Sequence, residues 1–194
     1  MTTTKELYNK VFGTLFHHGM NEEEADRVFD EIALFGDRGW EPFILLLSEV
    51  MTQKRDWPIE MAGSAKDSYL LYLATASDIE DGGKNHDKLN DQKGRDILFN
   101  DALRFNVNII SAFPEVVDSE VNNILECIRS TAEKLNLTVR KLDETDLWLA
   151  IGKGKEIPDS DVETIKNEKP ESTPKEAEIL RKYLLIKIKK WNGI

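Results

Sequence analysis

Carboxylates and histidines are the side chains of this chain that could do chemistry, and their spacing decides which chemistry is open to them. Glu23, Asp26 and Asp30 fall within about 60° of one another on a helical wheel, and Glu22 and Glu31 add negative charge around them. The opposite side of that helix carries an apolar stripe, formed by Ala25, Val28, Phe29 and Ile32. Such a carboxylate face can be solvated, can hold a metal ion or can bind a basic partner. We expect it to bind a partner.

A histidine–aspartate pair is the second candidate site. His86 and Asp87 are adjacent, and the pair resembles the dyad that metal-dependent HD-type phosphohydrolases place on a helix. The resemblance covers two residues and implies a further histidine and aspartate from other helices. The surrounding sequence, GGKNHDK, predicts a loop, whereas a preorganised metal site needs its ligands on rigid elements. A metal-dependent phosphohydrolase that uses His86 and Asp87 is therefore the alternative function.

The remaining candidate ligands are not expected to form a site. His17 and His18 are neighbours, so on a helix their side chains point about 100° apart and cannot readily share a metal ion. Cys127 is the single cysteine and lies beside an apolar helical stripe, which predicts a buried, unreactive thiol. We expect no catalytic residue, no metal and no cofactor.

Charge is divided unevenly along the 194 residues. Residues 1–150 carry 16 Lys and Arg against 28 Asp and Glu, whereas residues 175–194 carry six basic side chains and two acidic ones. The net charge of −10 argues against direct nucleic-acid binding, because phosphate contacts depend on Lys and Arg. The same charge can steer the protein toward a basic partner.

The first ten residues lack the apolar region of a secretory signal, and the longest apolar run is too short to span a membrane. We therefore expect a cytoplasmic protein without a membrane partner.

Helical periodicity dominates the elements that must position these residues. Asn21 and Glu24 form a variant of the capping box, Gly36 is a stop signal, and Pro42 and Pro114 each suit the first turn of a helix. The predicted helices cover about residues 7–18, 21–36, 42–50, 64–77, 92–105 and 114–135. Two short runs, 137–142 and 147–151, predict a β-hairpin, to which residues 107–110 could add a third strand. The expected fold is α-dominant (α+β), with a small β-hairpin or short sheet near 137–151.

The end of the chain is expected to form a separate element. Residues 1–151 are predicted to form the acidic, mostly helical domain, and residues 152–174 a polar connector whose Pro, Ser, Glu and Lys content is typical of disorder. Residues 175–194 then predict a basic amphipathic helix, with a strand at 185–189 as the alternative. Its apolar side chains would dock on the body or on a second copy in a homodimer: Ala177, Leu180, Leu184, Ile188 and Trp191.

Together these features favour a non-enzymatic function. We expect a small acidic binding protein that inhibits or adapts a basic protein partner, of the type of bacterial immunity proteins or phage counter-defence inhibitors. This expectation depends on the electrostatic pattern. The metal-dependent phosphohydrolase is one alternative, and a structural subunit of a homo-oligomer, assembled through the C-terminal segment, is another.

Overall fold

The structure is a computed structural model of the full chain. It describes the residues 5–7, 9, 11, 13, 22–53, 59–62, 68–71, 102–143, 147–168 and 173–192. Within these ranges the chain forms five helices and one sheet, together with short helical pieces near the N-terminus and at 69–71. The helices are α2 (Glu22–Arg38), α3 (Glu41–Gln53), α7 (Pro114–Lys134), α8 (Asp159–Lys166) and α9 (Pro174–Leu180). The strands are β1 (Ile59–Ala62), β2 (Leu103–Ser111), β3 (Leu137–Asp143), β4 (Trp148–Lys153) and β5 (Tyr183–Asn192).

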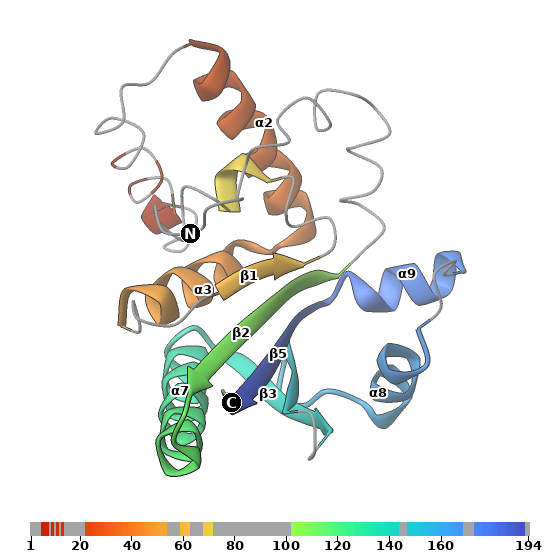
Figure 1. The fold of residues 1–194 in the computed structure, drawn as a ribbon. Coiled ribbons are helices and arrows are strands. Elements are labelled where there is room, and N and C mark those ends of the chain that lie inside the picture. The colour runs from red at the N-terminus through yellow and green to blue at the C-terminus, as the bar shows by residue number, and fades with distance from the viewer. Residues whose placement is uncertain are drawn as a thin grey trace.

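The sheet is mixed, and its strand order is β1-β2-β5-β4-β3. β2 and β5 pair in parallel, whereas the β1–β2, β3–β4 and β4–β5 pairs are antiparallel. The last strand of the chain therefore lies in the middle of the sheet, between two strands that precede it in sequence (Figure 1). This central strand cannot be removed without separating β2 from β4.

Helices cover both faces of the sheet (Figure 1). The first face packs against α2, α3 and α7 in a large hydrophobic core, to which β2 contributes Phe105 and Val107 and β5 contributes Ile186 and Ile188. The second face packs against α8 and α9 in a smaller core that includes Leu185, Ile165 and Leu180. Because β5 has apolar side chains on both sides, its first part is buried in two directions.

A Schellman motif at Gly39 fixes the path of the chain at the end of α2. Gly39 has a φ of +62°, its N–H donates to the Gly36 carbonyl, and the Trp40 N–H donates to the Phe35 carbonyl. These are the two hydrogen bonds of a Schellman motif, and the Phe35 and Trp40 rings, 5.5 Å apart, supply its hydrophobic contact. α2 therefore ends at Arg38, two residues beyond the stop predicted at Gly36.

The predicted α-dominant fold is wrong. The chain has a mixed α+β fold, and its C-terminal segment is strand β5 rather than an amphipathic helix. The spacing of Leu180, Leu184 and Ile188 fits a helix, but apolar and basic residues alternate at period two from Ile186 to Lys189. That alternation matches a strand with its apolar side on the core, and the β-branched isoleucines favour the strand as well.

The predictions for the other elements are partly confirmed and partly wrong. The β3–β4 hairpin and the helix after Pro114 are confirmed. The helix predicted to run through Phe105 is wrong at its end, because residues 103–105 begin β2, which extends well beyond the strand suggested at 107–110. The stretch 152–174, predicted to be a polar connector, contains α8 and the capping box that starts α9. Ile157, Val162 and Ile165 are buried there, so the described residues 152–168 do have enough apolar surface to order themselves.

Candidate functional site

α2 carries the predicted partner-binding carboxylates, and the structure divides them between its two sides. Glu22, Glu23, Asp26 and Asp30 are exposed on the outer side of the helix. Glu31 is only 2% exposed and lies on the inner side, so its prediction as a surface residue is wrong. Phe29 was expected to face the core, yet it is 48% exposed and shares the outer side with the carboxylates. The buried side is formed by Arg27, Val28, Glu31, Ile32 and Phe35.

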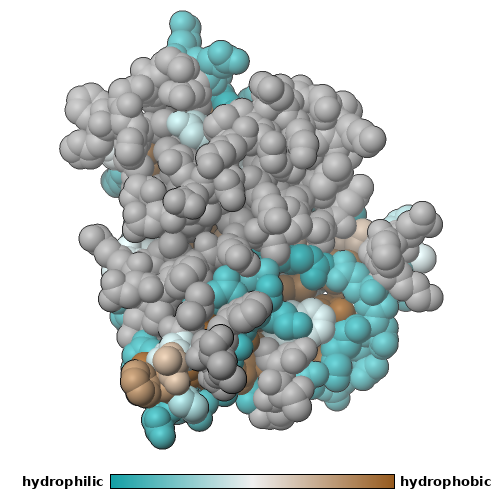
Figure 2. Space-filling model, viewed as in Figure 1, coloured by the Kyte–Doolittle hydropathy of each residue, from teal (hydrophilic) through white to brown (hydrophobic). Residues whose placement is uncertain are grey.

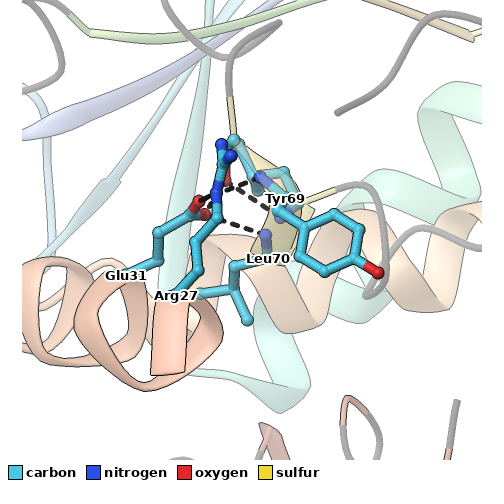
Figure 3. Close-up of polar contacts among 6 residues, drawn as sticks. Arg27, Glu31, Tyr69 and Leu70 are labelled. Carbon is cyan, nitrogen blue, oxygen red and sulfur yellow. Dashed lines mark hydrogen bonds and ion pairs between the residues drawn. The ribbon is translucent and has the colours of Figure 1, made fainter. Parts of the chain in front are cut away.

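Glu31 holds a second segment of the chain against α2 (Figure 3). Its carboxylate accepts hydrogen bonds from Ser68 Oγ at 2.7 Å, from the Leu70 N–H at 2.8 Å and from the Tyr69 N–H at 3.1 Å. Arg27, four residues earlier on α2, donates from Nε at 3.0 Å. The carboxylate therefore satisfies the first N–H groups of the helical residues 69–71, where the partial positive charge of a helix start favours an anion.

Ser68 completes this contact. Its Oγ accepts from the Leu71 N–H at 3.0 Å, as an N-cap hydroxyl does, while it donates to Glu31. The Arg27 guanidinium also lies 5.9 Å from the centre of the Tyr69 ring, within the range of a cation–π contact. The polar groups buried on this side of α2 thus have a structural function. A sequence signal for it existed, because Arg27 and Glu31 are an i,i+4 pair on the side of the wheel that also carries Val28 and Phe35.

The outer side of α2 is acidic along most of its length. Glu22 and Glu23 lie in the first turn, Asp26 and Asp30 follow in the next two turns, and Asp37 is exposed near the end. Figure 2 shows hydrophilic side chains at the top of the molecule, where α2 begins in Figure 1. The carboxylates of the first turn are stabilised by the partial positive charge of the helix start. This side therefore combines negative charge with one partly exposed aromatic ring.

The predicted docking residues lie within the sheet and its second layer. Leu180 is buried in α9, and Leu184 and Ile188 are buried in β5 on the side of the large core. Trp191 pairs with Ile110 in the register of β5 and β2. Leu180, Leu184 and Ile188 thus pack inside their own chain, and as part of a central strand the segment is not a free assembly element.

Cationic side chains gather where α2 and α9 end. Trp40 Nε1 donates to the Arg181 carbonyl at 2.7 Å, which joins the two helix ends. Burial and then the charge of Arg181 lower the pKa of Arg38, whereas Asp37 acts in the opposite direction. The Lys153 ammonium lies so close to Gly39 that a Cβ there would meet it at 2.2 Å. These cations lie at the negative ends of two helices, where positive charge is favourable, so their grouping is explained by the fold.

Polar contacts add to the small hydrophobic core that attaches the second layer to the sheet. The Tyr183 hydroxyl on β5 donates to Asp161 on α8, and burial together with this hydrogen bond raises the pKa of Tyr183 above its ordinary value. Arg140 on β3 donates to the Ile157 carbonyl and to Asp159, and Arg104 on β2 donates from Nη2 to both carboxylate oxygens of Glu168. All of these groups have protein partners, so they serve as structural ties.

The predicted alternative sites are not described by the structure or do not form a cluster. His17, His18, His86 and Asp87 lie outside the described residues. Among the residues that are described, no group of three or more His, Cys, Asp or Glu side chains is placed to hold a metal ion. Cys127 is buried on α7, and its Sγ lies 3.1 Å from Gln53 Oε1, an acceptor for the thiol proton.

Comparisons with known protein families, with curated proteins and with solved structures find no match for this chain. In the part of the chain that the structure describes, every helix is too short or too polar to cross a lipid bilayer. The fold and the charge of its surfaces are therefore the basis for any functional proposal.

Proposed function

We propose that this protein binds a basic protein partner through the outer side of α2 and so inhibits or adapts that partner. The observation that carries the proposal is that α2 has exposed carboxylates on its outer side and a buried, structural carboxylate on its inner side. Glu22, Glu23, Asp26 and Asp30 are exposed on the outer side, while the buried Glu31 fixes the inner side to residues 68–71. A face held in one orientation presents its charges to a partner at a fixed spacing, which favours specific recognition.

Phe29 adds an apolar element to this surface. Protein interfaces commonly place an aromatic side chain among polar ones, because the ring supplies contact area that charges alone do not. Phe29 lies on the same side of α2 as Glu22 and Asp26, at spacings of seven and three residues. A basic partner would therefore meet carboxylates that guide its approach and a ring that packs against it.

Inhibitors of the immunity-protein or phage counter-defence type fit this electrostatic logic, because a basic enzyme can be covered by an acidic surface. A cytoplasmic location is part of the proposal. The single cysteine, Cys127, cannot form an internal disulfide and is compatible with a reducing compartment.

The decisive experiment is affinity capture with the immobilised full chain and mass spectrometry. Three proteins are compared: the wild type, the outer-face variant Glu23→Lys/Asp26→Lys/Asp30→Lys, and a control variant Glu126→Lys/Glu133→Lys/Glu178→Lys. The control residues are exposed on α7 and α9 and produce the same change in net charge. Each capture is repeated at about 0.05 M and about 0.5 M salt, because exposed charge pairs are screened within a Debye length.

We expect a basic protein that the wild type and the control variant retain at low salt and that the outer-face variant loses. Higher salt should weaken the wild-type complex, because charge complementarity contributes mainly to the association rate and the specificity. Equal retention by all three proteins would exclude the outer side of α2. Equal loss in both variants would show that net charge alone, and not this face, governs binding.

A further inference from the structure

We draw no further inference here: the strongest candidate, the apolar surface that Phe113 and Val116 leave exposed where β2 leads into α7 (the brown area at the lower left of Figure 2), carries no proposal because nothing in the described part of the structure shows what covers it.

Discussion

The two faces of the sheet are covered by layers of different chemistry. On the first face, α2, α3 and α7 pack through a large hydrophobic core, and Glu31 is buried on the inner side of α2 with its partners at 68–71. On the second face, α8 and α9 bury a smaller core, and much of the attachment is through ion pairs and hydrogen bonds near the surface. Both layers remove apolar surface from water, and the second layer adds polar pairs near the surface to its smaller core.

This difference predicts that the two layers will respond differently to substitution. A buried polar network is destabilised strongly when one member is removed, because the remaining groups are left without partners in a medium of low dielectric constant. Exposed ion pairs contribute little, because water and salt replace the lost contact. The largest effects are therefore expected on the first face and the smallest at the rim of the second.

Replacing Glu31 by alanine should have the largest effect. The substitution leaves Arg27 as a buried cation and removes the acceptor of Ser68 Oγ and of the Tyr69 and Leu70 N–H groups. Breaking a buried ion pair from one side typically costs about 3–5 kcal/mol. We expect a loss of this size in the free energy of unfolding, measured by denaturant titration with circular dichroism.

Two matched variants test whether the loss of stability comes from the buried carboxylate of Glu31. Asp30→Ala, on the exposed side of the same helix, should change stability by less than about 0.5 kcal/mol. Glu31→Gln retains an oxygen acceptor and the side-chain volume, so it should fall between Asp30→Ala and Glu31→Ala. A loss for Asp30→Ala as large as that for Glu31→Ala would contradict the assignment of structural and surface carboxylates to opposite sides of α2.

Gly152 tests the packing between β4 and β5 on the second face. A Cβ at this position would lie 2.7 Å and 2.8 Å from two carbons of the Tyr183 ring, which is closer than side chains pack. Tyr183 is itself only 5% exposed and is held by Asp161, so the ring has little freedom to move away. Overpacking of this kind typically costs about 1–3 kcal/mol, and we expect Gly152→Ala to lower stability by that amount.

A second substitution separates this clash from a general intolerance of side chains in β4. In a Tyr183→Leu background the ring is absent, so Gly152→Ala should lose much less stability than in the wild type. The measurement is a double-mutant cycle of unfolding free energies. Equal effects of Gly152→Ala in both backgrounds would show that the ring is not the cause.

The helices of the first layer could be predicted well from the sequence, and the reason lies in their periodicity. α7 has Val117, Val121, Ile124 and Ile128 on one side, and Pro114 marks its first turn.

The structural role of Glu31 could not be predicted in the same way. A helical wheel shows that it lies near the apolar stripe, but its partners at 68–71 are 37 or more residues away in sequence, and only the tertiary structure brings them together.

The second layer and β5 were harder to predict, for physical reasons. Polar ties such as Arg104 to Glu168 leave no apolar pattern, so residues 152–174 have the composition of a linker although they contain α8. β5 pairs in parallel with β2, some eighty positions earlier in the chain, and local sequence carries little information about such a pairing. The apolar side chains at 184 and 188 fit both the helical and the strand periodicity. At the start of β5, both faces are buried, so consecutive residues are apolar and do not alternate with polar ones.

Tyr183→Phe should have a smaller, pH-dependent effect on the second face. The variant keeps the ring but loses the hydrogen bond to Asp161, which is worth about 1 kcal/mol. The pKa of Tyr183 is raised in the folded protein, so in alkali the unfolded chain loses this proton first and binds fewer protons than the native state. The stability advantage of the wild type over Tyr183→Phe should therefore be constant below about pH 10 and decline as the pH rises further. An advantage that grows above pH 10 in paired thermal melts would show that the sign is wrong.

The ion pair between Arg104 and Glu168 should show the smallest effect and the clearest dependence on salt. Both side chains are partly exposed, at 21% and 24%, so the pair is expected to contribute up to about 1 kcal/mol although Arg104 Nη2 contacts both carboxylate oxygens. Glu168→Gln keeps the size of the side chain and removes its charge, and its destabilisation at about 0.05 M salt should shrink at about 1 M salt, where charges are screened within about 3 Å. The loss caused by Glu31→Ala should stay nearly constant over the same range, because the buried network is shielded from the counterions. Salt titration of the two variants side by side thus compares a surface pair with a buried network. A salt-independent loss for Glu168→Gln would mean that this pair does not act through its charge.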